Sequence, residues 1–94
     1  MKVLIVGAGD IGFHLTKQLS KDHDITLIDH DPRKVKRASE QLDAFVLEGH
    51  GGSYKVLKEA NLKKTKIVAA MTNNDELNLV ICQLAKKAGV VGPA

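Results

Sequence analysis

The sequence predicts a Rossmann-like α/β domain, with a parallel sheet of strand order 3-2-1-4 and helices on both of its faces. Short runs of aliphatic and β-branched residues alternate with segments of helical periodicity along the chain. A complete G-x-G-x-x-G follows the first of these runs directly and opens the first helical segment. Strict alternation of strands and helices implies parallel strands joined by right-handed crossovers.

Continuous apolar runs indicate the strands. The first run consists almost entirely of valine, leucine and isoleucine, as a strand buried on both faces requires. The predicted strands are Lys2–Val6, Asp24–Asp29, Ala44–Leu47 and Ile67–Met71. A full Rossmann sheet continues with two more strands, and a fifth would begin at Val90–Ala94. We therefore expect residues 1–94 to form a single domain that is truncated before strand five and belongs to a longer chain.

Capping signals indicate where the helices begin and end. The first helix runs from Asp10 to about Lys21, with apolar residues at helical spacing, namely Ile11, Leu15 and Leu19. In the second, Asp31 is the N-cap and Pro32 the first helical residue, and the helix continues to about Gln41. Ser53 caps a third helix, which continues through Ala60 and stops at Asn61. Thr72 or Asn73 caps a fourth, which ends before Gly89.

Composition excludes several classes of function. The net charge is +3, but acidic residues are interleaved with the basic ones and only three aromatic residues could stack on bases, so we expect no nucleic-acid partner. The sequence lacks a run of about 20 apolar residues, so we expect no direct membrane insertion. A single cysteine cannot form an internal disulfide, which favours a reducing, cytoplasmic location.

The glycine motif indicates a dinucleotide-binding loop. Gly7 permits a tight turn, Gly9 lets the backbone approach a pyrophosphate, and Gly12 lets the helix pack closely on the strand. The N-terminus of the following helix offers N–H groups and a positive dipole end to phosphates. The motif alone is weak, and its position between a strand and a helix gives it weight.

The acid at the end of the second strand supports the same interpretation. Asp29 is placed to accept hydrogen bonds from adenosine ribose hydroxyls, and its charge would repel the additional phosphate of NADP. Arg33 and Lys34 follow, and a cation there would contact a 2′-phosphate or adenine, or simply lie in solvent. We therefore expect NAD(H), with AMP, ADP and ATP as alternatives that present the same adenosine and a phosphate.

Two further loops lie at the same edge of the predicted sheet. Gly49-His50-Gly51-Gly52 follows the third strand, and its three glycines suggest backbone conformations that other residues resist. His50 would face the adenine end of the ligand, or be an ordinary loop histidine. Thr72–Glu76 follows the fourth strand, and its hydroxyl and amides would contact the ligand or act only as helix caps. Asn78 lies within a helix, where asparagine is mildly unfavourable, which invites a functional or interface role.

Several of these segments together resemble one family, the N-terminal nucleotide-binding domains of TrkA-type regulators, also called RCK or KTN domains. The resemblance covers essentially the whole chain, and the most distinctive block is Met71–Leu79, which generic dehydrogenases lack. The family often has an acid where His50 stands, and histidine resembles the version found in bacterial Trk regulators. The other matching segments are Gly7–Gly12, Asp24–Asp29, Asp31-Pro32, Gly49–Gly51 and Val56–Ala60.

The resemblance implies a set of ligand contacts. Glycines of the first loop and the backbone around Asp10 and Ile11 would hold the pyrophosphate, and Asp29 the adenosine ribose. His50 would lie near the adenine, and Thr72 and Asn73 near the phosphates or the nicotinamide. The candidate cofactor-binding residues are Gly7, Gly9, Asp10, Ile11, Gly12, Asp29, His30, Arg33, Gly49, His50, Thr72 and Asn73. We predict no catalytic residue and no metal ligand.

The resemblance also implies a non-catalytic regulator. Such proteins bind NAD(H) or adenine nucleotides, assemble into dimers and larger rings, and gate an integral membrane potassium transporter, which would place the chain in the cytoplasm, peripheral to the inner membrane. The alternative is the cofactor domain of an NAD-dependent dehydrogenase, which needs a substrate domain to supply an acid–base group. The fourth helix, apolar around more than one face, independently favours a homo-oligomer.

Overall fold

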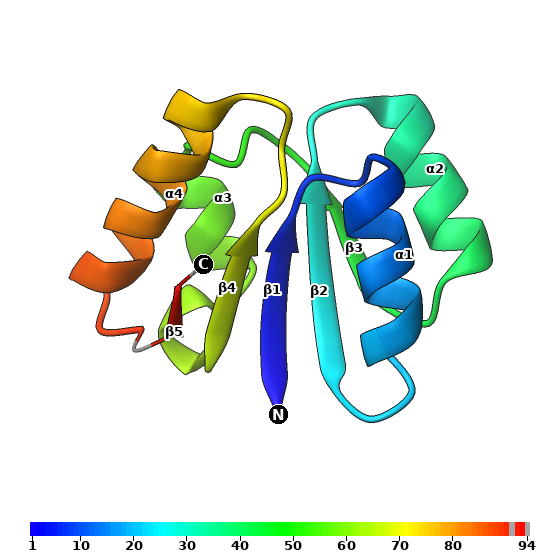
Figure 1. Ribbon diagram of the computed structural model, residues 1–94, viewed down its shortest axis with the longest axis horizontal. Helices are drawn as coiled ribbons and strands as arrows, with labels where there is room; N and C mark the ends of the chain where they lie inside the picture. The colour runs from blue at the N-terminus through cyan, green and yellow to red at the C-terminus, as the bar shows by residue number, and fades with distance from the viewer. Residues whose placement is uncertain (91, 94) are drawn as a thin grey trace.

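Five parallel strands form the sheet, in the order β3-β2-β1-β4-β5 (Figure 1). The computed structural model describes residues 1–90 and the backbone of residues 92 and 93. The strands are β1 (Lys2–Val6), β2 (Asp24–Asp29), β3 (Phe45–Glu48), β4 (Ile67–Ala70) and β5 (Gly92–Pro93). The predicted order of the first four is confirmed. The sequence analysis expected the chain to end before strand five, whereas a short β5 pairs with β4; residues 91 and 94 lie outside the described residues.

Helices cover both faces of this sheet (Figure 1), as the alternation of elements predicts. They are α1 (Asp10–Leu19), α2 (Pro32–Gln41), α3 (Tyr54–Glu59), a 3-10 turn η1 (Leu62–Lys64) and α4 (Asp75–Lys87). The stop predicted at Asn61 is confirmed, because this residue has a left-handed φ of 59°. The 3-10 turn that follows was not predicted. Among these helices, none is long and apolar enough to cross a membrane.

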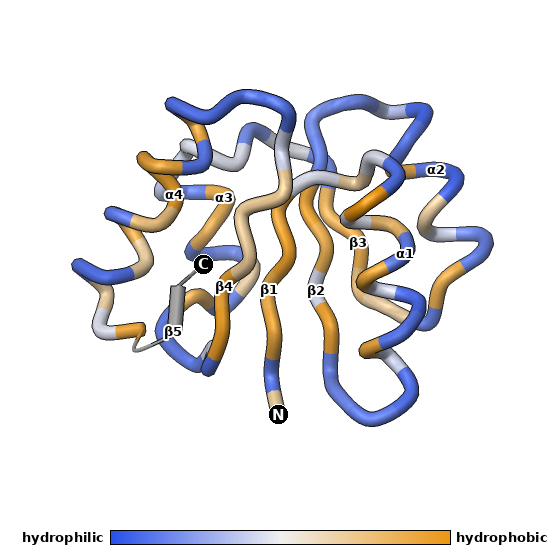
Figure 2. The backbone as a smooth tube through the Cα atoms, viewed as in Figure 1, coloured by the Kyte–Doolittle hydropathy of each residue, from blue (hydrophilic) through white to orange (hydrophobic). Residues whose placement is uncertain are grey.

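Two separate cores lie on the two faces of the sheet. Along β1, Leu4 and Val6 face one core while Val3 and Ile5 face the other, because successive side chains of a strand point in opposite directions. α3 and α4 close the first core, and α1 and α2 close the second. The strands are accordingly the most hydrophobic part of the chain, while the loops that follow β2 and β4 are hydrophilic (Figure 2).

Of the three residues at apolar spacing on α1, Leu15 and Leu19 pack against the second core and Ile11 does not. Ile11 is 73% exposed, whereas Phe13 is buried. Gly12 and Thr16 are buried with Phe13, and the hydroxyl of Thr16 donates to the carbonyl of Gly12 at 2.8 Å. The helix approaches the sheet on its glycine, and Ile11 is thereby left facing solvent. This places a large apolar side chain at the carboxyl edge of the sheet, where the loops gather.

Candidate functional site

The loops after β1, β2, β3 and β4 meet at the carboxyl edge of the sheet. Backbone hydrogen bonds extend beyond the strands into these loops, for example from the Gly7 N–H to the Ile28 carbonyl at 2.7 Å, and from the Met71 N–H to the Val6 carbonyl, also at 2.7 Å. Between the loops lies a cleft of about 710 Å³, a volume within the usual range for small-molecule sites. It is lined by Gly7, Gly9, Asp10, Ile11, Asp29, His30, Lys34, His50, Met71, Thr72, Asn73, Asn74 and Leu77.

The three glycines of the first loop differ in the space available for a side chain. Gly7 has a φ of +113°, and a Cβ there would lie 2.6 Å from the carbonyl oxygen of Met71. A Cβ on Gly12 would lie only 1.7 Å from the carbonyl oxygen of Gly7. At Gly9, in contrast, a Cβ would meet nothing within 4 Å. Folding therefore requires glycine at two of these positions, while the third borders the open cleft.

The N-terminus of α1 points free donors at this opening. Gly9 is the N-cap, and because it has no side chain it leaves the helix uncapped. The N–H groups of the first turn, Asp10 to Gly12, have no acceptor within the helix. Side chains do cap the other three α-helices, namely Asp31 in α2, Ser53 in α3 and Asn74 in α4. Among the α-helices of the described residues, only α1 is open to an external acceptor at its cap, and its dipole favours an anion.

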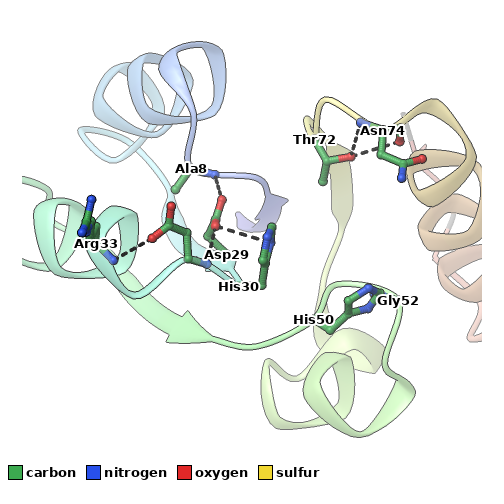
Figure 3. A network of polar contacts seen from close by, with 9 residues as sticks. Ala8, Asp29, His30, Arg33, His50, Gly52, Thr72 and Asn74 are labelled. Carbon is green, nitrogen blue, oxygen red and sulfur yellow. Dashed lines mark hydrogen bonds and ion pairs between the residues drawn. The ribbon is translucent and has the colours of Figure 1, made fainter.

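Asp29 is buried at the end of β2, with only 7% of its surface exposed. One carboxylate oxygen accepts the Ala8 N–H at 2.7 Å, and the other accepts the Asp31 N–H at 2.8 Å (Figure 3). The carboxylate therefore ties the glycine loop to the loop before α2, a contact that sequence alone did not predict. A carboxylate has about four acceptor sites, and these two bonds leave about two of them unused.

Two basic side chains, those of His30 and Lys34, line the cleft together with Asp29. His30 is largely exposed, and its Nδ1 lies 3.7 Å from a carboxylate oxygen of Asp29. Lys34 lines the cleft, whereas Arg33 does not, although its backbone N–H donates to Asp31 at 2.9 Å. The sequence analysis considered both cations and selected Arg33 as a candidate contact. The structure places Lys34, and not Arg33, in the lining of the cleft.

His50 faces the cleft from the loop after β3 (Figure 3). Its Nδ1 accepts the Gly52 N–H at 3.0 Å, so in the neutral ring Nε2 carries the proton and is the free donor. The expectation of special backbone conformations at the glycines of this loop is wrong, because none has a positive φ. They are required by space, since a Cβ at Gly49 would lie 2.8 Å from Val56 and one at Gly51 would lie 2.4 Å from Val6. Gly49 does not line the cleft.

The loop between β4 and α4 forms the opposite wall. The predicted cap of α4 at Thr72 or Asn73 is wrong, because the side chain of Asn74 accepts the Leu77 N–H at 3.0 Å. Thr72 and Asn73 line the cleft, as do the neighbouring Met71, Asn74 and Leu77, which the sequence analysis did not select. The side chains of Met71 and Leu77 are apolar and gave no polar signal, so only the resemblance of the Met71–Leu79 block pointed to these two residues.

Nine of the twelve candidate residues line the cleft: Gly7, Gly9, Asp10, Ile11, Asp29, His30, His50, Thr72 and Asn73. The other three, Gly12, Arg33 and Gly49, lie outside its lining. Gly12 supports the loop through packing instead, as its contact with Gly7 shows. In the described part of the chain, no group of three or more His, Cys, Asp or Glu residues could hold a metal ion.

Comparison with known families agrees with these features. The model of the TrkA-N domain matches residues 3–91 of the chain. A Trk system potassium uptake protein TrkA homolog of Archaeoglobus fulgidus is 38% identical over 89 residues, covering 95% of this chain and 20% of that protein. A TrkA homolog of Methanosarcina mazei is 42% identical over 86 residues, covering 92% of this chain and 21% of that protein. The chain thus spans about a fifth of the length of these relatives.

Solved structures share the fold at lower identity. The C-terminal domain of Kef from Shewanella denitrificans, described as AMP-bound, has a TM-score of 0.78 and 24% identity, covering 93% of this chain and 52% of that one. A GsuK channel bound to NAD has a TM-score of 0.78 and 21% identity, covering 92% and 16%. An oxidoreductase from Lactococcus lactis is also similar, with a TM-score of 0.77 and 20% identity, covering 99% and 46%. At these identities the likeness concerns the fold alone.

Proposed function

The chain belongs to the TrkA-N domain family, and from this membership and the cleft we propose that it is a non-catalytic, NAD(H)- or adenine-nucleotide-binding regulatory domain of a Trk-type potassium uptake system. The observation that carries the proposal is Gly9. Its missing side chain serves no packing purpose, because a Cβ would meet nothing within 4 Å, yet it leaves the end of α1 bare. A phosphate group that approaches the backbone closely accounts for both features.

The residues present fit a dinucleotide. Free N–H groups of the first turn of α1 would receive the pyrophosphate, and the two unused acceptor sites of Asp29 would receive ribose hydroxyls. Exposed Ile11 and partly buried Met71 and Leu77 offer apolar contacts for a base. The names of the relatives and the AMP and NAD in two similar structures support this ligand class.

Calorimetric titration of the chain with NADH, NAD, ATP and AMP tests the proposal directly. We expect saturable binding of at least one of them, weakened by mutation within the cleft. If all four titrations give only heats of dilution, the proposed function is wrong. Asp29→Ala is an unsuitable first probe, since this carboxylate also holds the Ala8 and Asp31 backbones and its loss would disturb the loops themselves.

Lys34 and Arg33 provide a matched pair of probes for the ligand's charge. Both are exposed on the first turns of α2, but only Lys34 lines the cleft. Neutralising a partly solvated contact to a phosphate removes about 1 kcal/mol, so Lys34→Gln is expected to weaken nucleotide binding about fivefold in calorimetry. Arg33→Gln is expected to change affinity less than twofold. Equal effects of the two substitutions would contradict the assignment of Lys34.

We propose that the bound nucleotide is a signal for a transporter rather than a hydride donor. A dehydrogenase needs a substrate and an acid–base group next to the nicotinamide, usually from a second domain. A regulator instead needs two assembly states that bind the ligand with different affinity. The names of the relatives favour the regulator, with an integral membrane potassium transporter as the partner. Detectable NADH turnover with small carbonyl substrates would favour the dehydrogenase.

We also propose that the chain forms a homo-oligomer, at least a dimer. On α4, Leu79 is 63% exposed and Val80 is 46% exposed, and both border an apolar hollow that also includes Leu84. Side chains of this size in one exposed group favour a protein partner. Multi-angle light scattering is expected to give a mass at least twice the 10.2 kDa of one chain. A monomer at high micromolar concentration would contradict this expectation.

A further inference from the structure

Asn78 lies one turn inside α4, where asparagine is a poor helix former, yet its side chain makes an organised set of contacts. Its Oδ1 accepts the backbone N–H of Thr72 at 3.1 Å and also accepts the Thr72 hydroxyl. Its Nδ2 donates to the backbone carbonyl of Thr72 at 3.0 Å. One amide therefore holds the N–H, the carbonyl and the hydroxyl of a single residue six positions earlier.

These contacts leave Thr72 with little to offer a ligand. The hydroxyl also accepts the Asn74 N–H at 3.2 Å, and its one proton is used within the loop, toward Asn78 or the Asn74 carbonyl. A phosphate only accepts hydrogen bonds, so this hydroxyl is unavailable as a donor to it. Asn73 differs: it is exposed, it lines the cleft, and its side chain makes no hydrogen bond with the described residues.

We infer that Asn78 is a positioning residue, which fixes Thr72 so that the neighbouring Asn73, and not Thr72, provides this wall's polar contact to the ligand. The contact between Asn73 and a ligand rests on the proposed function. The positioning of Thr72 by Asn78 concerns the chain without a ligand. It gives a reason for an asparagine within the helix, because alanine there would favour the helix and leave the Thr72 backbone without its partners.

The test combines two measurements on the same variants. Amide hydrogen exchange by NMR, without ligand, reports on the Thr72 N–H, and calorimetry with the nucleotide that the wild-type chain binds best reports on affinity. Asn78→Ala is expected to raise the exchange rate of the Thr72 amide at least tenfold and to weaken binding about tenfold. Asn73→Ala is expected to weaken binding to a similar degree and leave the Thr72 exchange rate unchanged. Gln18→Ala, which removes an exposed amide on α1 outside the lining of the cleft, is the matched control and should change neither.

The outcomes separate the inference from the proposed function. Faster Thr72 exchange in Asn78→Ala together with an affinity within twofold of wild type would overturn the inference alone, and so would unchanged exchange in that variant. Unchanged affinity in Asn73→Ala would overturn the role given to Asn73. A wild-type chain that binds none of the nucleotides would overturn the proposed function and the inference with it. The expected pattern in all three variants would support both.

Discussion

Gly12→Ala is expected to lower the free energy of unfolding by about 3 kcal/mol or more, which corresponds to a decrease in Tm of about 12 °C or more for a chain of this size. The reason is steric, because the new Cβ would lie 1.7 Å from the carbonyl oxygen and 2.9 Å from the carbonyl carbon of Gly7. Neither atom belongs to a flexible side chain, so α1 must move away from β1. A domain of 94 residues has roughly 5–14 kcal/mol in total, so the loss is a large share.

Thermal and urea denaturation followed by circular dichroism measure this effect. Gly9→Ala is the matched control, since it makes the same chemical change three residues earlier in the same turn, at a site with nothing within 4 Å. A Tm for Gly12→Ala within about 3 °C of the control would contradict the close approach of helix and strand described above.

Gly9→Ala is expected to weaken nucleotide binding about 100-fold, or about 2.7 kcal/mol, while the chain stays folded. The Gly9 backbone has a φ of −70° and a ψ of −170°, which alanine adopts without strain. Alanine is a poorer N-cap than glycine, but it also reduces the entropy of the unfolded chain, so the two effects on stability offset each other within about 1 kcal/mol. In the cleft, however, the methyl group would occupy space that a phosphate needs in order to reach the N–H groups of α1.

Calorimetry gives the affinity of this variant, and a thermal melt without ligand verifies its fold. An affinity within threefold of wild type, in a variant that melts normally, would mean that the ligand does not approach Gly9 and would remove the main support for the proposed site. Together, the substitutions at positions 9 and 12 are expected to separate binding from folding within one glycine motif.

Much of the fold could be predicted because it depends on local patterns. Continuous apolar runs indicate buried parallel strands, and the strand β1 was predicted with its observed ends at Lys2 and Val6. The cap at Asp31 followed by proline also fixed the start of α2. Strict alternation of elements then left few topologies for the sheet, and the observed order was among them.

The remaining features depend on how the elements pack. Apolar spacing assigned Ile11 to the buried face of α1, but the glycine beside it lets the helix approach more closely and turns Ile11 outward. Neighbouring residues on a helix are about 100° apart, so the choice between Arg33 and Lys34 required the orientation of α2. The hydrogen bonds between Asp29 and Ala8 and between Asn78 and Thr72 join different loops and helices. The distances between such elements in space cannot be read from the spacing of residues along the sequence.

The open space at Gly9 has a consequence for how this sequence can change through evolution. Selection for a folded chain acts on Gly12, because a side chain there would clash with backbone atoms of Gly7. The same selection acts only weakly on position 9, where a Cβ would meet nothing within 4 Å. A descendant that no longer needs its ligand would be free to replace Gly9 while it retains Gly12. A relative with a side chain at position 9 and a glycine at position 12 is therefore expected to have retained the fold and lost nucleotide binding.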